Sequence, residues 1–362
     1  MVAEICFTAD WLEKKRKELK GVDPGLLERA LHAFALLGHL AESNLKFVFK
    51  GGTSLLLHLP VIRRLSIDID ILCSAPTAEL DRILGEVANV APFIRYEEDE
   101  RGSRGLPERR HFKFFYTPLV PSNPAPYIFL DVVEEKHIPH EVVIKPITPE
   151  ILEISREILV TVPTVESLLA DKLTAFAPRT IGVPFVPANG NPPDTMQIVK
   201  QMYDVGELFN LAEDLAAVRR VYQKVFVLEN EYRGGDFTPA DTLEDTLQAS
   251  LLLCLHGLKG VKDQMPEALM ILDGASKLRG HLANHTFNPI MAKLAASKAA
   301  LIARLIKNEE SDLTMAAIKA KPSTDELRRL EITGEWERLN RLKLVSEDAF
   351  WYWYLASKLN ER

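Results

Sequence analysis

Two short motifs contain the residues whose types and spacing best suit chemistry. Gly51, Gly52 and Thr53 follow an apolar run, and Asp68 and Asp70 come a short distance later. Glycines at a turn let backbone N–H groups approach a triphosphate closely, and the positive end of a helix that starts there favours the anion. On a strand, carboxylates two positions apart project from one face, about 7 Å apart along the backbone. Together the motifs predict a site for a nucleotide and a cation.

The carboxylate pair indicates Mg²⁺. Two carboxylates this close resist ionising together unless a divalent cation neutralises them. Magnesium takes one or two carboxylates, keeps some water and completes its shell with substrate phosphate oxygens, which suits nucleotidyl transfer. Asp131 is the best candidate for a third metal ligand because it is an acid in an otherwise apolar strand, and Glu134 and Glu135 are less well placed. The alternative for Asp131 is an edge-strand acid that faces water.

These motifs carry a resemblance to a known family. GG followed by Thr, then a DxD on the next strand, resembles the DNA polymerase β-like nucleotidyltransferase superfamily. More narrowly, KGGTSL with RRLSIDID resembles the AbiEii/AbiGii nucleotidyltransferase toxin family, in which a serine lies two positions before the DxD, here Ser66. That family also has a lysine on a downstream helix, matched by Lys172 in ESLLADKLTAF, and an acid in a YD pair, matched by Asp204. The resemblance covers roughly residues 44–211.

The resemblance implies a fold and an activity. The fold is α+β, a polymerase β-like mixed sheet with helices, followed by a mainly helical domain. The activity is Mg²⁺-dependent transfer of a nucleoside monophosphate from an NTP to an acceptor, an RNA such as the tRNA 3′ end in related toxins. Such a toxin acts in a toxin–antitoxin or phage-defence system and has a cognate antitoxin as a possible partner. A protein or small-molecule acceptor, or an NTP sensor without transfer activity, are the alternatives.

The downstream pair would add a positive charge to the site. An ammonium on a helix can neutralise phosphate oxygens or the leaving pyrophosphate in a loose transition state, and Lys172 is the candidate. Asp204 could orient Lys172 or accept the acceptor's proton. The alternative for Lys172 is a solvated lysine paired with Glu166 or Asp171 on a helix surface, which is a common arrangement.

Other polar residues near the motifs suit phosphate binding. Arg64, with Arg63 before it, precedes the carboxylate motif and could grip a triphosphate. Ser66 could contact a phosphate. A separate basic stretch in this acidic chain could meet an acceptor's phosphates. It consists of Arg101, Arg104, Arg109, Arg110 and Lys113.

The elements that must position these residues change in character along the chain. The first part is expected to be mixed α/β and the remainder helical, which gives a nucleotidyltransferase-like domain at 1–162 and a helical domain at 163–362 that contributes Lys172 and Asp204 to the site. The proline-rich loop at 178–193 is expected to be mobile. Strands are expected at 46–50, 65–70, 93–98, 110–116, 127–133 and 141–145. Helices are expected at 24–42, from Thr53 to 59, and at 77–90, 164–177, 194–216, 241–259, 265–283 and 288–306.

Composition bounds these expectations. The 362 residues suffice for two domains, and a formal net charge of -7 argues against a chain that coats nucleic acid nonspecifically. Three widely separated cysteines show no zinc or disulfide spacing and fit reduced thiols. The start lacks a signal-peptide pattern, and no apolar run reaches the length of a membrane span, so a cytoplasmic protein without membrane contact is expected.

Overall fold

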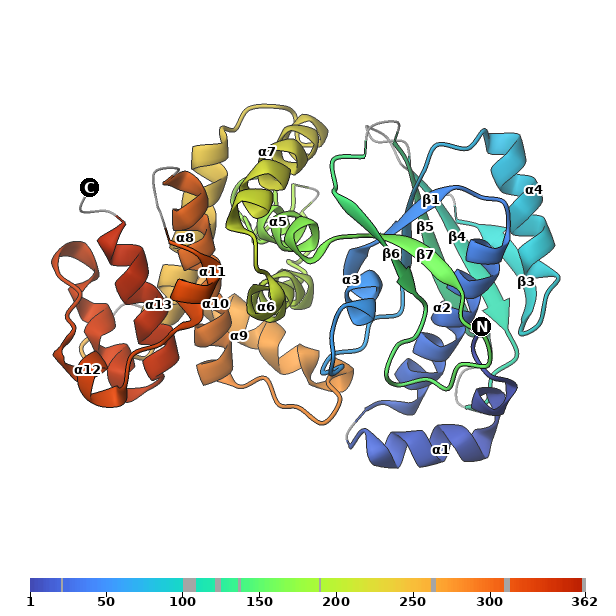
Figure 1. Ribbon diagram of the computed structural model, residues 1–362, viewed down its shortest axis with the longest axis horizontal. Coiled ribbons are helices and arrows are strands. Elements are labelled where there is room, and N and C mark those ends of the chain that lie inside the picture. Colours follow the sequence, from blue (N-terminus) through green and yellow to red (C-terminus); the bar gives the residue numbers. More distant parts are fainter. Residues whose placement is uncertain are drawn as a thin grey trace. The chain divides into compact units, whose positions relative to one another are not determined.

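The structure is a computed structural model, which describes the chain in eight segments. They are residues 1–20, 22–99, 109–120, 125–135, 138–188, 190–261, 265–308 and 313–359. The chain divides into two compact units, Met1–Thr164 with Gly280–Thr286, and Val165–Arg279 with Phe287–Arg362. The first unit contains a mixed sheet with helices and the second is helical (Figure 1). The expected α+β fold class is therefore confirmed.

A five-stranded sheet forms the centre of the first unit. Its strand order is β1-β2-β5-β4-β3. β2 and β5 are parallel, and every other neighbouring pair is antiparallel. The strands are β1 (Phe47–Lys50), β2 (Ile69–Cys73), β3 (Phe93–Glu98), β4 (Arg109–Tyr116) and β5 (Tyr127–Glu134). Because β5 is central, Asp131 is not an edge-strand acid.

One face of this sheet is the apolar core of the unit. Along β5, Ile128, Leu130 and Val132 are fully buried, whereas the alternate residues are partly exposed. The buried face packs in one apolar cluster with α2 (Pro24–Glu42) and α4 (Thr77–Ala88). α2 begins where the sequence predicts, because the Asp23 carboxylate accepts a hydrogen bond from the N–H of Leu26 at 2.8 Å. The partly exposed face is the one that can present polar side chains to a ligand.

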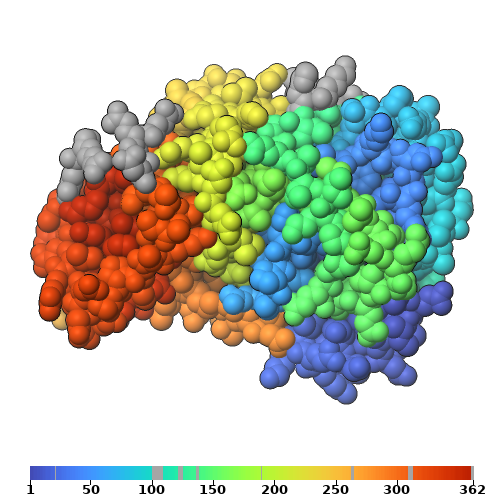
Figure 2. Space-filling model, viewed as in Figure 1, coloured from blue at the N-terminus to red at the C-terminus, as the bar shows by residue number. Residues whose placement is uncertain are grey.

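A second, two-stranded sheet completes the strands of the first unit. β6 (Val142–Pro146) pairs antiparallel with β7 (Leu159–Pro163). β7 is missing from the expected strands because it is short and ends in proline, which is also typical of a loop. Figure 2 shows this part of the chain at the surface, in green. The remaining elements of the unit are η1 (Glu4–Phe7), α1 (Ala9–Glu18), α3 (Gly51–Ser54) and η2 (Leu55–Leu57).

The second unit is a helical assembly, and no strand occurs among its described residues. Its helices are α5 (Val165–Ala175), α6 (Thr195–Leu211), α7 (Leu215–Tyr232), α8 (Pro239–Leu255), α9 (Pro266–Lys277), α10 (Pro289–Lys307), α11 (Met315–Lys319), α12 (Thr324–Arg329) and α13 (Glu347–Lys358). η4 (Gly334–Leu344) is a 3₁₀ segment of this unit, whereas η3 (Leu278–His281) begins in this unit and ends in the first. In the described part of the chain, no helix combines the length and apolar character that crossing a bilayer requires.

The bounds of two helices predicted in this region were wrong. The single helix expected at 194–216 is two helices, because Asp214 accepts hydrogen bonds from the N–H groups of Ala216 and Ala217 and so starts α7. The helix expected at 265–283 ends as α9 at Lys277, and a 3₁₀ turn follows. The segment Gly280–Thr286 belongs to the first unit, although the sequence places everything after residue 162 in the second domain.

The three cysteines, Cys6, Cys73 and Cys254, are free and buried. Burial raises the pKa of each thiol above its ordinary value, because a thiolate there would lack the stabilisation that water provides. The expectation of unpaired thiols is confirmed. None of the three is suited to nucleophilic chemistry, since the reactive form of a cysteine is the thiolate.

Candidate active site

The glycine turn is in close contact with the carboxylate motif. β1 ends at Lys50, and α3 begins at Gly51, whose φ is +79°. A Cβ on Gly51 would lie 2.1 Å from Oδ2 of Asp70, and one on Gly52 would lie 3.0 Å from Oγ of Ser66. Position 51 therefore requires glycine, for its backbone conformation and for the close approach of Asp70, whereas a Cβ on Gly52 would be in tight contact with the ends of two side chains.

The helix after the turn is shorter than expected. The sequence predicts a helix from Thr53 to 59, but α3 starts two residues earlier and spans only Gly51–Ser54, followed by the 3₁₀ turn η2. Ser54 Oγ donates to the carbonyl oxygen of Gly51 at 2.9 Å, within this turn. A single turn has only a weak dipole, so an anion there would be held by backbone N–H groups more than by a helix field.

Asp68 lies outside the strand that was expected to contain it. The sequence predicts a strand at 65–70, whereas β2 begins at Ile69 and continues to Cys73. Lys50, the last residue of β1, already pairs with Asp70, so β1 offers no partner to the residues before it. Asp68 is held instead by Thr53, whose Oγ1 donates to the Asp68 carbonyl oxygen at 2.6 Å. The two motifs are thus linked directly.

A row of four polar residues crosses the sheet. Asp70 is the register partner of Lys50 on β1 and of Asp131 on β5, and Asp131 is the partner of His111 on β4. Register partners project from the same face, with neighbouring strands about 4.8 Å apart. Nδ1 of His111 lies 2.7 Å from Oδ1 of Asp131. Asp70 and Asp131 are therefore neighbours on the partly exposed face, and Asp131 is oriented by a hydrogen bond.

Arg64 and Ser66 reach the same turn from the segment before β2. A Cβ on Gly52 would lie 3.1 Å from Nη2 of Arg64, similar to its distance from Ser66 Oγ. Arg64 is buried, and its Nη1 donates to the carbonyl oxygen of Leu65 at 3.3 Å. The segment is fixed by an isolated bridge between Arg64 and Leu282, which explains why residues 280–286 join the first unit. Two polar side chains thus face the glycine turn.

Lys172 and Asp204 form an ion pair within the second unit. Lys172 on α5 is 7% exposed and Asp204 on α6 is 0% exposed. The Lys172 Nζ is 3.5 Å from Oδ2 of Asp204 and donates to Oε1 of Gln201 at 3.2 Å. The alternative of a solvated surface lysine paired with Glu166 or Asp171 does not hold, because Lys172 is buried. The Glu166 carboxylate accepts hydrogen bonds from backbone N–H groups just before α7. A buried pair of this kind restricts the lysine to few conformations.

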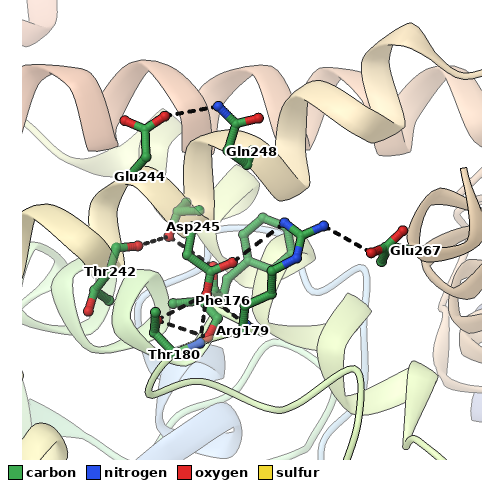
Figure 3. A network of polar contacts seen from close by, with 10 residues as sticks. Phe176, Arg179, Thr180, Thr242, Glu244, Asp245, Gln248 and Glu267 are labelled. Atoms are coloured by element: carbon green, nitrogen blue, oxygen red, sulfur yellow. Dashed lines mark hydrogen bonds and ion pairs between the residues drawn. The ribbon is translucent and has the colours of Figure 1, made fainter. Parts of the chain in front are cut away.

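The loop after α5 is fixed at its start. The Asp245 carboxylate on α8 accepts hydrogen bonds from the N–H groups of Arg179 and Thr180, at 2.7 and 2.9 Å (Figure 3). Burial raises the pKa of Asp245, and these hydrogen bonds and the Arg179 charge oppose that shift. Arg179 also pairs with Glu267 at 3.0 Å. The expectation of mobility for the loop at 178–193 does not suit its first residues, and Asn189 lies outside the described residues.

The basic stretch is largely paired with acids. Arg110 makes ion pairs with Asp81 at 2.8 Å and with Glu98 at 2.7 Å. Lys113 pairs with Asp99 at 3.1 Å. Two members of the stretch lie outside the described residues, Arg101 and Arg104. The charge that the described part offers to an acceptor's phosphates is therefore smaller than the sequence suggests.

Sequence reasoning did not single out His111, Tyr127 or Phe129, which the sheet brings to the same face as Asp131. The period-2 alternation of β5 could have indicated Tyr127 and Phe129, because they lie four and two residues before Asp131. His111 carries no such signal, since its contact with Asp131 depends on the pairing of two strands. Within the described residues, no group of three or more His, Cys, Asp or Glu side chains could hold a metal ion by itself.

A glycine turn packed against neighbouring carboxylates on a mixed sheet suits an enzyme that acts on nucleotides. Residues 35–268 match the family described as the nucleotidyl transferase AbiEii toxin of type IV toxin–antitoxin systems, and the match spans more than half of the chain. The chain therefore belongs to the AbiEii family of nucleotidyltransferase toxins. This confirms the resemblance carried by the two motifs.

Two solved structures of bacterial proteins are similar to this chain. MenT4, a nucleotidyltransferase toxin from Mycobacterium tuberculosis, is 16% identical, with 94% of this chain and 97% of MenT4 covered and a TM-score of 0.49. JHP933 from Helicobacter pylori is 15% identical, with 78% and 93% covered and a TM-score of 0.39. No curated protein matches the chain significantly.

Proposed function

We propose that this protein transfers a nucleoside monophosphate from an NTP to an RNA acceptor such as the tRNA 3′ end, with Mg²⁺. The acceptor's hydroxyl oxygen forms a bond to the α-phosphorus, and pyrophosphate leaves. The observation that carries the proposal is the contact of Gly51 with Asp70, which has Asp131 as its register partner on the next strand. Phosphate-binding backbone and acidic side chains thereby meet at one place.

The residues present fit magnesium. Asp70 and Asp131 supply hard carboxylate oxygens from adjacent strands, and Asp68 precedes them on the same segment. Magnesium commonly uses one or two carboxylates together with substrate phosphates, so a site without three protein ligands is suited to it. When bound, the ion would neutralise charge on the transferring phosphoryl group. His111 would hold the Asp131 carboxylate in one orientation, as hydrogen-bond partners of metal ligands do.

The glycine turn and its neighbours would hold the triphosphate. Glycine at both positions allows phosphate oxygens to approach the backbone N–H groups of Gly51 and Gly52. The Arg64 guanidinium and the Ser66 hydroxyl lie against Gly52 and would donate to the same oxygens. Thr53 would act indirectly, because its hydroxyl fixes the Asp68 backbone.

We also propose roles in transfer for Lys172 and Asp204, which match the family's downstream motif. In this proposal Lys172 neutralises charge on the leaving pyrophosphate and Asp204 orients the ammonium. The support is the match of ESLLADKLTAF and of the YD pair to the family's downstream motif, together with the ion pair that joins Lys172 to Asp204.

A double replacement separates a structural role of this pair from a catalytic one. Lys172→Met alone should lower the free energy of unfolding by about 3–5 kcal/mol, because Asp204 keeps a buried charge after its cation is lost. Lys172→Met with Asp204→Leu removes both charges and should recover most of that stability. We expect the double variant to fold and yet transfer nucleotide on the order of 10²-fold more slowly. Denaturant unfolding and initial transfer rates measure the two effects.

A buried lysine elsewhere in the same unit is the matched control. The Lys293 Nζ donates to the carbonyl oxygens of Leu253, Cys254 and His256, and its side chain is similarly buried. Lys293→Met should destabilise the unit without a specific loss of transfer in the folded fraction. A double variant of Lys172 and Asp204 that transferred at the wild-type rate would show that the pair is structural only.

The proposed acceptor and biological role are supported by the family. Membership in a type IV toxin family implies an antitoxin, and RNA is the acceptor implied by the resemblance to related toxins. The net charge of -7 favours an RNA contact confined to one part of the surface over a broad electrostatic one. A role in phage defence belongs to the same proposal.

Transfer is tested by labelling. The full chain is incubated with each of the four NTPs in turn, labelled on the α-phosphate, with Mg²⁺ and total cellular RNA. We expect label in RNA from the α-labelled donor, no label from a γ-labelled donor, and loss of labelling when EDTA removes the metal. Fractionated tRNA then identifies the labelled end.

Other outcomes assign another function. If the labelled NTP binds to the protein but is not transferred, the result would support a sensor and overturn the proposal of transfer activity. Label on protein, or on an aminoglycoside from a panel tested in parallel, would keep the donor half of the proposal and overturn the RNA acceptor.

A further inference from the structure

Two aromatic side chains continue the acidic row along β5. Tyr127 and Phe129 share the face of Asp131, because the side chains of a strand alternate between its faces. Both are partly exposed, whereas Phe112 and Phe114 on the neighbouring strand face the core and are at most 1% exposed. On the same face, Phe115 is 7% exposed and packs edge-to-face on Tyr127, with centroids 5.5 Å apart. Tyr127 and Phe129 therefore extend an aromatic cluster to the surface of the unit.

A small cleft lies beside these rings and the first carboxylate of the motif. It has a volume of about 240 Å³, and its lining includes Asp68, Tyr127, Phe129, Arg29 and Ala125. Pockets that enclose a drug-sized ligand have roughly 300–1,000 Å³. This cleft is smaller, so it suits one planar ring system and not a whole nucleotide.

The rings are arranged as a corner with a cation above them. Tyr127 and Phe129 have centroids 4.9 Å apart and planes at 75°. The Lys113 ammonium lies 5.4 Å from the Tyr127 centroid and 5.9 Å from the Phe129 centroid. Asp99 pairs with Lys113 at 3.1 Å and fixes it there. An aromatic surface with a nearby cation attracts flat, electron-rich rings attached to phosphates.

We propose that Tyr127 and Phe129 form a stacking site for a nucleobase, in the cleft that Asp68 also lines. Lys113 contributes positive charge beside the attached sugar and phosphate. The site rests on the proposed function, because it places a base next to the carboxylates that would act on the α-phosphate. The base comes either from the NTP donor or from the terminal nucleotide of the acceptor.

A fluorescent base tests stacking directly, since the emission of 2-aminopurine is quenched when it stacks on an aromatic ring. One arm titrates the full-length protein with 2-aminopurine riboside triphosphate, and the other with a single-stranded RNA oligonucleotide that ends in 2-aminopurine. Phe129→Leu and Tyr127→Leu remove a ring and keep an apolar side chain. We expect each to reduce the quenching and to weaken binding in one arm by roughly tenfold, within the range of about 5- to 150-fold that loss of stacking gives.

Two further variants guard against a loss of fold. Phe129→Tyr keeps the ring and should retain quenching. Tyr96→Leu is the matched control, because Tyr96 is a partly exposed aromatic residue that stacks on Phe114 of the buried face, with centroids 5.6 Å apart. Tyr96→Leu should alter the unfolding midpoint without changing binding in either arm.

The results decide the source of the base and the proposal itself. A loss confined to the triphosphate arm, seen in transfer assays as a higher KM for NTP at an unchanged kcat, assigns the base to the donor. A loss confined to the oligonucleotide arm assigns it to the acceptor. If Phe129→Leu and Tyr127→Leu bind as Tyr96→Leu does in both arms, the stacking site is refuted. Failure of the proposed function looks different, since wild-type protein would quench the probe but transfer no label.

Discussion

Asp70→Asn and Asp131→Asn should each slow nucleotide transfer by roughly 10³-fold while the protein stays folded. Asparagine keeps the shape of aspartate and removes its charge, and loss of metal-assisted charge stabilisation is worth several kcal/mol in the transition state. The two residues are register partners on adjacent strands, so each should matter as much as the other. Initial rates with α-labelled NTP over a range of Mg²⁺ concentrations measure the effect, and excess Mg²⁺ should restore part of the rate.

The control for these variants is a carboxylate of the same unit outside the acidic row. Asp81 on α4 pairs with Arg110, and its side chain is 44% exposed and lies outside the acidic row, so Asp81→Asn should leave transfer within about twofold of wild type. Thermal unfolding of all three variants shows whether a loss of rate reflects the site or the fold. If Asp70→Asn retained the full rate, the metal-site interpretation would be wrong.

Gly51→Ala should slow nucleotide transfer strongly and lower the free energy of unfolding only moderately. A Cβ at this position meets Oδ2 of Asp70 at 2.1 Å, so the carboxylate must move away from its present place. A displacement of about 1 Å at a reacting group can slow a reaction about 10²-fold. The φ of +79° adds a backbone cost of roughly 1–2 kcal/mol for a residue with a Cβ. Transfer rate and unfolding midpoint are measured on the same preparation.

Alanine variants of two other glycines separate the energetic cost of a positive φ from the effect of the clash with Asp70. Gly235 has a φ of +82°, and a Cβ at this position would meet no atom within 4 Å, so Gly235→Ala carries the backbone cost alone. Gly85 lies in α4 with an ordinary φ and the same open surroundings, so Gly85→Ala should be neutral or stabilising. We expect only Gly51→Ala to lose transfer. Equal losses in Gly51→Ala and Gly235→Ala, each measured per folded molecule, would show that the Asp70 contact is unimportant.

Features that depend on local sequence were predictable. α2 has the expected bounds because Asp23 caps it and Pro24 suits its first turn. The strand before the glycine turn was predicted from one block of sequence, residues 46–70, which also carries the main part of the family resemblance. The turn contacts Asp70 through β1 and β2, which are antiparallel neighbours joined by a short segment, so few other arrangements compete.

Element ends were less predictable because neighbours decide them. The strand at Asp70 starts at Ile69 and not at residue 65, since a ladder forms only where a partner strand is present. β7 is a strand because β6 pairs with it. Segment 280–286 joins the first unit through its bridge to Arg64, although it is distant from that residue in sequence.

The amino-acid sequence by itself determined the family, the α+β class and the two motifs that make up the site, because each depends on residue types over a short stretch of chain. The tertiary structure alone decided that Asp131 is the register partner of Asp70, that His111 orients it and that Lys172 is buried with Asp204. The reason is that pairing register between distant strands, and burial between distant helices, is set by packing of the whole unit, and a slip of one residue would turn each side chain to the other face.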